Sequence, residues 1–282
     1  MKIVLAGTPH FSVKVFETVI NKFDVVAIIT QPDKPKGRGL KILTTPVKQL
    51  AQRYGIKIFQ PKKIKEIEKE LNELNYDILL TCAYGQIIPE QILKTANKIA
   101  LNIHGSILPK YRGAAPIQYS ILNGDSKTGI SLIKMTNKMD AGDILFTSET
   151  VIENSYTSGD MFDILSVLAS ESIEQWLERI SQDSFTLKKQ NEKEVSFSPK
   201  ITKEQCEITK NHTIFEAQRI IKAFNPFPGA FIMKDNKKFK VFNYGEAGIE
   251  YKLKDGSIFI TEIQSPGKKS MSWEVFLKGN KF

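Results

Sequence analysis

The stretch DILLTCAYGQIIPEQILKTANKIALNIH, residues 77–104, decides the fold class. Two apolar runs, Asp77–Cys82 and Ile99–Ile103, flank a short segment with helical character, Glu90–Thr95. Continuous apolar strands separated by helices are typical of a parallel sheet that is covered on both faces. The stretch therefore predicts a strand–helix–strand unit of an α/β domain.

The same alternation extends over the first half of the chain. Further strands are expected at Lys2–Ala6, Val25–Thr30, Ile56–Phe59, Gly129–Met135 and Asp143–Thr150. Helices are expected at Val13–Lys22, Pro46–Tyr54, Ile64–Leu74, Ala115–Asn123 and Ser158–Arg179. Open α/β sheets bind ligands outside the carboxyl ends of their strands, so we expect the functional site at that edge.

The composition of the sequence changes near residue 181. Residues 181–203 are polar and contain a Ser-Pro pair, which indicates a linker. We place the linker at 186–203, between a first domain at 1–185 and a second at 204–282. The second domain begins with a helix at Ile214–Phe224, and four short strands separated by turn residues follow: Ala230–Lys234, Lys238–Phe242, Ile249–Leu253 and Ser257–Ile263. This pattern predicts a small all-β module of the barrel class.

Composition limits the class of protein. The chain has 282 residues, which suits two domains, and no apolar run approaches the roughly 20 residues that span a bilayer. The N-terminal run MKIVLAGTP lacks the apolar core and cleavage site of a signal peptide. Two cysteines, Cys82 and Cys206, without CxxC, CxxH or HExxH spacing, argue against a zinc site or a disulfide framework. We expect a cytoplasmic protein with no metal and no membrane contact.

The net charge of +9 leaves several partners open. Residues 191–282 hold 16 Lys or Arg against 11 Asp or Glu, a balance of +5. Lysine-rich solvated faces alone produce such values, and so does a surface that binds a polyanion. Charge does not choose between nucleic acid, a phosphorylated substrate and anionic lipid. The absence of GxGxxG and of GxxxxGK[ST] after the first strand argues against NAD and nucleoside triphosphates.

Asn102 and His104 lie at the carboxyl end of a predicted strand, and alternation puts both on the same side. Acyl transfer needs a donor to a developing oxyanion and a group that accepts a proton, and an amide and an imidazole supply these functions. Asp140, 36 residues after His104 in a turn-like setting, is the candidate carboxylate that orients the histidine. Ser106 is the best candidate nucleophile, but it lacks the GxSxG context, so direct attack by a substrate amine is the simpler hypothesis.

The run NIHGSILP at 102–109, followed by YRGAAPIQ at 111–118 and DAGD at 140–143, resembles the folate-dependent formyltransferases. Further stretches are similar to the branch that acts on methionyl-tRNA: AGTP at 6–9, QPDKPKGRG at 31–39, AYGQIIP at 83–89, AFNP at 223–226 and PGKK at 266–269. The resemblance covers nearly the whole chain. It implies a Rossmann-like formyltransferase domain with a mostly parallel α/β sheet, followed by a small C-terminal OB-like β-barrel. It also implies formyl transfer from 10-formyltetrahydrofolate to the α-amine of methionyl initiator tRNA by a monomer.

The resemblance also assigns roles to residues. The catalytic group would be Asn102, His104 and Asp140. The folate site would be lined by Tyr84, Gly85, Gln86, Ser106, Ile107, Leu108 and Pro109. Transfer RNA would be contacted by the basic loop 33–41, through Lys34, Lys36, Arg38 and Lys41. Charge alone gives this loop two interpretations, a solvated surface loop or a phosphate-binding one.

The sequence departs from the family pattern in two places, and it leaves two alternative functions open. His10 stands where the family commonly has an acidic residue, and the region Val241–Ile263 is short enough that we expect a barrel trimmed by one or two strands. The first alternative is a formyltransferase that acts on a nucleotide-linked amino sugar or another small amine. The second is an RNA-binding module with an inactive α/β domain, against which the intact catalytic group argues.

Overall fold

The computed structural model describes residues 1–36 and 41–279, which form two compact units. The first, called the α/β unit, comprises residues 1–112, 129–150 and 163–197. The second, called the C-terminal unit, comprises residues 113–128, 151–162 and the described residues from 198 onward. Segments 113–128 and 151–162 therefore group with the C-terminal residues and not with their neighbours in the chain.

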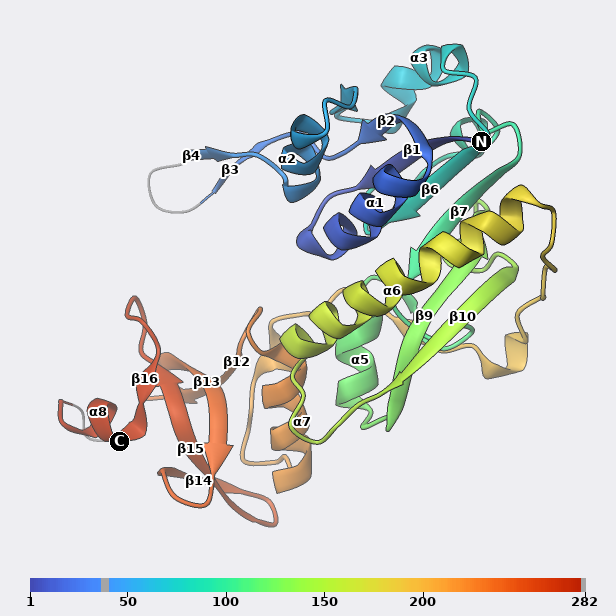
Figure 1. The fold of residues 1–282 in the computed structure, drawn as a ribbon. Coiled ribbons are helices and arrows are strands. Elements are labelled where there is room, and N and C mark those ends of the chain that lie inside the picture. Colours follow the sequence, from blue (N-terminus) through green and yellow to red (C-terminus); the bar gives the residue numbers. More distant parts are fainter. Residues whose placement is uncertain (37–40, 280–282) are drawn as a thin grey trace. The chain divides into compact units, whose positions relative to one another are not determined.

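The α/β unit is built on a seven-stranded sheet with the order β10-β9-β7-β6-β1-β2-β5 (Figure 1). The strands are β1 (Lys2–Gly7), β2 (Asp24–Ile29), β5 (Ile58–Phe59), β6 (Ile78–Cys82), β7 (Ile99–His104), β9 (Lys127–Lys134) and β10 (Ile144–Val151). Strands β5, β2, β1, β6 and β7 run parallel to their neighbours, and β9 runs antiparallel to β7. The predicted α/β class with a mostly parallel sheet is confirmed.

Helices cover both faces of this sheet. They are α1 (His10–Lys22), α2 (Pro46–Arg53), the 3₁₀ turn η1 (Ile64–Ile67), α3 (Glu68–Glu73), α4 (Glu90–Leu93) and α6 (Ser158–Ser181). Helices α1 and α6 lie side by side, because the Ser166 hydroxyl donates to the Phe11 carbonyl at 2.9 Å and Lys22 pairs with Glu174 at 2.8 Å (Figure 1). His10 is the exposed first residue of α1.

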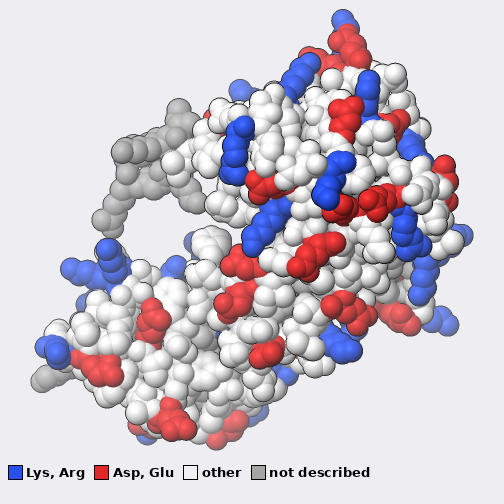
Figure 2. Space-filling view, viewed as in Figure 1, with Lys and Arg blue, Asp and Glu red and all other residues white. Residues whose placement is uncertain are grey.

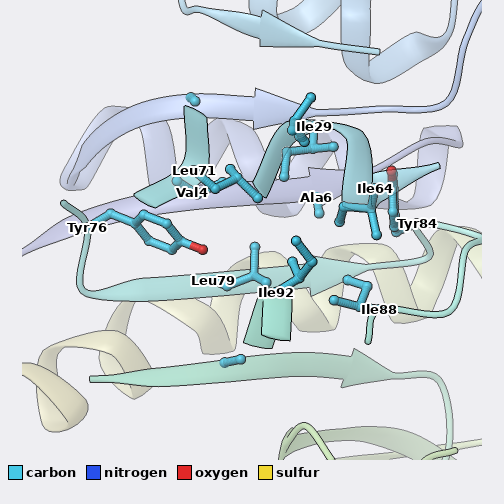
Figure 3. Close-up of a cluster of buried hydrophobic side chains, with 13 residues drawn as sticks. Val4, Ala6, Ile29, Ile64, Leu71, Tyr76, Leu79, Tyr84, Ile88 and Ile92 are labelled. Carbon is cyan, nitrogen blue, oxygen red and sulfur yellow. The ribbon is translucent and has the colours of Figure 1, made fainter. Parts of the chain in front are cut away.

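Strand alternation divides the apolar side chains of the sheet between its two faces. Val4 and Ala6 belong to a buried cluster with Ile64 and Leu71, residues of η1 and α3, and the cluster includes Tyr84 after β6 (Figure 3). The intervening residues of β1, Ile3 and Leu5, are buried as well. Each fully buried large side chain contributes about 1.5–3 kcal/mol, so burial on both faces holds the helices against the sheet.

The C-terminal unit contains a five-stranded antiparallel sheet. Strands β12 (Ala230–Lys234), β13 (Lys237–Gly245), β15 (Gly256–Gln264) and β14 (Ile249–Leu253) follow one another in space, and β16 (Met271–Ser272) pairs with β15. Its helices are α5 (Pro116–Leu122), α7 (Ile214–Phe224) and α8 (Trp273–Leu277), with the 3₁₀ turn η3 (Glu204–Cys206). Five strands is the number that an OB fold has. The sequence did not predict β16 or α8.

Helix α7 has the predicted bounds, and its first turn is capped. The Thr213 hydroxyl accepts from the Glu216 amide, and the Glu216 carboxylate accepts from the Thr213 amide, which is a complete capping box. Its other end is followed by Asn225, whose side chain donates to the Phe242 carbonyl in β13 at 2.8 Å. The helix is therefore fixed at both ends within its own unit.

None of the described helices is long and apolar enough to cross a membrane. Acidic and basic side chains are intermixed over the face of the α/β unit that Figure 2 shows. The excess positive charge of the chain is therefore not gathered into a single-sign patch on that visible face.

Candidate active site

The candidate site lies at the carboxyl end of β7, near the middle of the α/β sheet. Asn102 and His104 are two residues apart on this strand and project to the same side, as alternation predicts. In the sheet register, Thr81 of the neighbouring strand β6 stands opposite Asn102. The turn after β1 packs tightly nearby, since a Cβ on Gly7 would lie 2.8 Å from the Cys82 carbonyl oxygen.

The Asn102 amide has a defined orientation. The Thr81 hydroxyl donates to Asn102 Oδ1 at 2.7 Å, so the amide oxygen faces β6. Asn102 Nδ2 then points away from β6 and lies 3.4 Å from Asp140 Oδ1. The strand therefore presents an N–H donor, and not an oxygen, toward the carboxylate.

The His104 imidazole is buried and is held through one nitrogen. Its Nε2 lies 2.8 Å from the Tyr111 carbonyl oxygen, which can only accept, so Nε2 carries a proton. Nδ1 faces Asp140 Oδ2 at 3.7 Å. In the neutral ring Nδ1 is an acceptor, whereas in the protonated ring it becomes a second donor beside the carboxylate. The nitrogen that faces Asp140, Nδ1, is thus the one whose hydrogen-bond role depends on the protonation of the ring.

The loop that carries Asp140 is tied at its neck. The Lys134 amide donates to the Asp143 carbonyl at 2.9 Å, and a Cβ on Gly142 would lie 1.7 Å from the Lys134 carbonyl oxygen. Only glycine allows this close approach. Asp140 itself has a left-handed backbone, with φ of 49°. The structure therefore brings Asn102, His104 and Asp140 together, as the sequence predicted.

Gln190 links this loop to a buried arginine. Its Nε2 donates to the Asp140 carbonyl at 2.8 Å and to the Gly142 carbonyl at 2.7 Å. Its Oε1 accepts from Arg112 Nε at 3.0 Å, and the Arg112 guanidinium also pairs with Glu192 at 2.8 Å. The hydrogen bond from Arg112 lowers the pKa of the Glu192 carboxyl. The buried arginine charge is thus compensated by an acceptor and a carboxylate.

The loop after β7 is rigid, and its serine is engaged. The buried Ser106 hydroxyl donates to the Lys110 carbonyl at 2.6 Å. The Ser131 hydroxyl donates to the Ser106 carbonyl at 2.8 Å and accepts from the Leu108 amide at 3.0 Å. Leu108 packs with Ile133 and Ile144 in a small apolar cluster. Ser106 therefore serves the loop and is not arranged as a nucleophile beside His104.

Tyr84, Gly85 and Gln86 form the turn that follows β6. The Tyr84 hydroxyl is buried without a hydrogen-bond partner among the described residues, and burial raises its pKa to about 12. The Tyr84 carbonyl accepts from the Thr8 hydroxyl at 2.9 Å, and Gly85 adopts a φ of 85°. The Gln86 side chain accepts from the Ile64 amide at 3.0 Å. Figure 3 shows Tyr84 beside Ile64 at the arrowhead end of the strands.

The predicted basic loop 33–41 is framed by a two-stranded hairpin of β3 (Lys34–Lys36) and β4 (Lys41–Leu43). Its base is anchored, because Asp33 accepts from Lys48 Nζ at 2.5 Å and from Gln60 Nε2 at 2.8 Å. These hydrogen bonds, first that from Lys48, lower the pKa of the Asp33 carboxyl. The predicted tRNA contacts fall as follows: Lys34 is exposed, Lys36 and Lys41 pair through their backbones, and Arg38 lies outside the described residues.

Sequence reasoning missed four residues of this site: Thr81, Tyr111, Arg112 and Gln190. In the sequence, Thr81 does not differ from the other residues of its strand, and Gln190 lies in the polar segment that is predicted to be a linker. Their roles come from contacts between residues 7 to 78 positions apart, such as those from His104 to Tyr111 and from Arg112 to Gln190. Contacts of this kind leave no periodic pattern in the sequence. Within the described ranges no group of three or more His, Cys, Asp or Glu could hold a metal ion.

Comparison with known proteins identifies the class and then the family. The formyl transferase family matches residues 1–176, and the C-terminal domain of formyl transferases matches residues 200–281. Among solved structures, the sugar 3N-formyl transferase WlaRD has the same fold, with a TM-score of 0.69 at 20% identity over 95% of this chain and 99% of that chain. The fold and the site thus define a formyl transferase.

Relatives of high similarity narrow this class. The methionyl-tRNA formyltransferase of Mycoplasmopsis pulmonis is 46% identical over 100% of this chain and 95% of its own length. The methionyl-tRNA formyltransferase of Lactobacillus gasseri is 38% identical over 98% of this chain and 95% of its own length. The chain belongs to the methionyl-tRNA formyltransferase family.

Proposed function

We propose that the protein transfers the formyl group of 10-formyltetrahydrofolate to the α-amine of methionyl initiator tRNA, which yields N-formylmethionyl-tRNA for translation initiation. The observation that carries the proposal is the cluster of Asn102, His104 and Asp140 at the carboxyl end of β7. Its chemistry fits an amine attacking a carbonyl, since it offers the N–H donor of Asn102, the imidazole nitrogen Nδ1 of His104 and one carboxylate at one point. Relatives that span the whole chain carry the same activity in their names.

The residues around this point suit a folate co-substrate, which supplies an electrophilic formyl carbon. The related-fold enzyme WlaRD was solved in the presence of 5-N-formyl-THF. In this chain Tyr84 keeps a buried hydroxyl that no described residue satisfies, and an orphaned buried hydroxyl favours a ligand that pairs with it. Tyr84–Gln86 and Ser106–Pro109 would hold the co-substrate, the first with a polar hydroxyl and the second with the apolar Leu108.

Asn102 and His104 stabilise the oxygen of the reacting carbonyl. As the amine attacks, negative charge develops on the formyl oxygen, and donors fixed in advance stabilise it without reorganisation. Asn102 Nδ2 is fixed by the hydrogen bond from Thr81 to Oδ1. His104 is fixed by Nε2–H donating to Tyr111, which leaves Nδ1 facing the site. The Asn102 donor and the His104 ring, which donates from Nδ1 only when it is protonated, are thus both held in place by contacts within the protein.

Asp140 and His104 handle the proton. The attacking amine must lose one proton, and the folate nitrogen that leaves must gain one, so the reaction is balanced by a single proton relay. Asp140 Oδ2 lies 3.7 Å from His104 Nδ1, so the two groups face each other just outside hydrogen-bond distance. Catalytic hydrogen bonds that are long in an unliganded enzyme tighten when the substrate binds, and this pair would then pass the proton.

Transfer RNA would approach through basic groups. The exposed Lys34 lies in the hairpin whose base is anchored by Asp33, and Lys36, Arg38 and Lys41 complete the set of positive charges in this segment of the sequence. Lysine and arginine neutralise phosphates and so position a nucleic acid. Most of the expected linker at 186–203 belongs to the α/β unit, which extends to residue 197. We therefore place catalysis in the α/β unit and tRNA binding in the region 204–282, in a monomeric cytoplasmic enzyme that acts on initiator tRNA.

A transfer assay tests the function. The protein is incubated with 10-formyltetrahydrofolate and methionine-charged initiator tRNA, and formyl-methionine is measured after deacylation. A parallel reaction replaces the tRNA by a nucleotide-linked amino sugar, the alternative class of acceptor. We expect formyl-methionine and no formylated sugar. Formylation of the sugar alone would overturn the assignment to tRNA, and turnover of neither acceptor would favour a catalytically inactive RNA-binding module.

A further inference from the structure

Residues 188–196, here called the strap, make hydrogen bonds to both loops that carry the catalytic group. At one end, Lys188 and Ile144 exchange backbone hydrogen bonds of 2.8 and 2.9 Å next to the Asp140 loop. At the other end, the Ser196 hydroxyl accepts from the Tyr111 amide at 2.9 Å. A polar segment with such contacts on both sides of a site is part of its framework.

Gln190 occupies the middle of the strap with every polar atom of its side chain engaged. Nε2 has two hydrogens, and two carbonyls receive them, those of Asp140 and Gly142. Oε1 accepts from Arg112 Nε. The amide therefore has one orientation, because a flipped amide would set its NH2 against the guanidinium and its oxygen against two carbonyls.

Arg112 keeps this orientation fixed. Its side chain is only 7% exposed, so its guanidinium depends on protein acceptors, which Gln190 and Glu192 provide. The neighbouring residue, Tyr111, accepts the proton of His104 Nε2 through its carbonyl. The strap therefore reaches Asp140 through Gln190 and reaches His104 through Tyr111.

We propose that Gln190 is a positioning residue for the catalytic reaction, acting through Asp140. The proposal rests on the proposed function, in which Asp140 serves the proton relay. Asp140 has the left-handed φ of 49°, a conformation that aspartate adopts when its surroundings favour it. The two N–H bonds from Gln190 fix the carbonyls on either side of Ala141 and so fix the direction of the Asp140 side chain. The distances to Asn102 Nδ2 and His104 Nδ1 depend on that direction.

The test is a double-mutant cycle on the full-length enzyme. Gln190→Met keeps the size of the side chain and removes all three hydrogen bonds, and Asp140→Asn removes the carboxylate charge. We expect Gln190→Met to lower kcat by about 10- to 100-fold, the scale of a misplaced catalytic group, with KM for both substrates within about 2-fold of wild type. In the Asp140→Asn background the same change should lower kcat by less than about 2-fold, because there is no carboxylate left to position.

A matched control separates positioning from general loss of structure. Gln49 is an exposed glutamine of the same unit whose Nε2 donates to the Thr44 hydroxyl at 2.8 Å, so Gln49→Met removes a comparable bond away from the site. It should leave kcat unchanged. If Gln190→Met does not fold, Gln190→Glu takes its place, since it keeps the oxygen that faces Arg112 and loses both N–H donors. The same loss of kcat is expected.

Each outcome decides the proposal. Full kcat in Gln190→Met, or an equal loss of kcat in the wild-type and Asp140→Asn backgrounds, overturns the positioning role of Gln190. A full kcat in Asp140→Asn overturns the role of Asp140 itself, and the inference with it. A low kcat in Asp140→Asn together with a normal one in Gln190→Met overturns the inference alone.

Discussion

Asn102 presents its amide nitrogen to the candidate site because Thr81 takes its amide oxygen. The hydrogen bond between them is 2.7 Å long and joins two neighbouring residues of adjacent parallel strands, so it favours one orientation of the Asn102 amide. The same logic applies to His104, whose Nε2 proton is committed to a backbone carbonyl. At the residue scale the site is therefore defined by which donor and acceptor atoms already have a hydrogen-bond partner within the protein.

Removal of the Asn102 donor should lower the rate of transfer. We expect Asn102→Ala to reduce kcat by about 10²- to 10³-fold, the effect of losing one preorganised donor to an oxyanion. Measurement of kcat and KM in the formylation assay checks this. Asn97→Ala is the matched control, since Asn97 is an exposed asparagine that donates to Asn75 at 2.9 Å away from the site. A kcat near wild type in Asn102→Ala would remove Asn102 from the catalytic group.

At the element scale, two short segments, the strap and the β3–β4 hairpin, hold loops in place, which their composition does not indicate. The strap ties the Asp140 loop and the Tyr111 turn into one framework, although its sequence is polar and irregular. The β3–β4 hairpin carries the basic loop on a base that is held by Asp33, Lys48 and Gln60. Both segments are positioned by side-chain hydrogen bonds together with short stretches of backbone pairing.

The anchor of the hairpin has a pH signature. The pKa of Asp33 is lowered in the folded protein, so its charged form contributes stability that is present above the ordinary aspartate pKa, near 4, and is lost as the pH falls through the lowered value. Asp33→Asn should therefore reduce Tm by about 1 to 4 °C at pH 7, as expected for a pair worth roughly 0.5 to 1 kcal/mol. The difference from wild type should shrink below about pH 4.

Thermal unfolding of wild type and Asp33→Asn from pH 3 to pH 7 measures this effect. Asp24→Asn, a change at an exposed aspartate in the same unit, controls for the loss of a charge. A Tm difference for Asp33→Asn that stays constant down to pH 3 would contradict the anchoring role, because it would not follow the titration of the carboxyl group.

At the scale of the whole molecule, the contact with tRNA should be electrostatic. The chain carries +9, and phosphate contacts release counterions, so the affinity for tRNA falls with salt. If about four phosphates are neutralised, raising the salt from 50 to 200 mM should increase KM for tRNA by a factor on the order of 10². The KM for the folate substrate should change little.

A single lysine tests where this dependence arises. Lys34→Ala should reduce the slope of log KM against log salt by about 1, which is the share of one phosphate contact. Lys69→Ala is the control, since Lys69 is an 88% exposed lysine of α3 that pairs with Glu73. An unchanged slope in Lys34→Ala would show that Lys34 does not meet a phosphate.

The two structural units are not continuous stretches of the chain, so a division of the sequence into consecutive domains does not describe them. Segments 113–128 and 151–162 group with the C-terminal residues, so the chain passes between the units more than once. A composition change near residue 181 marks where the polar segment begins, but it carries no information on which earlier helices pack with later strands. Such packing depends on the apolar faces that meet after folding.

The sequence by itself determined the α/β class and most of the strands and helices in chain order, and it predicts Asn102, His104 and Asp140 as the catalytic group, whose side chains lie together in the structure. Strand alternation and a dense local motif are sufficient for Asn102 and His104, because both are properties of adjacent residues. Only the tertiary structure decided the orientation of the Asn102 amide, the protonated nitrogen of His104 and the part played by Gln190. These depend on hydrogen bonds that join residues 21, 7 and 50 positions apart. Such bonds follow from the path of the folded chain, and polar side chains that make them have no periodicity that a sequence displays.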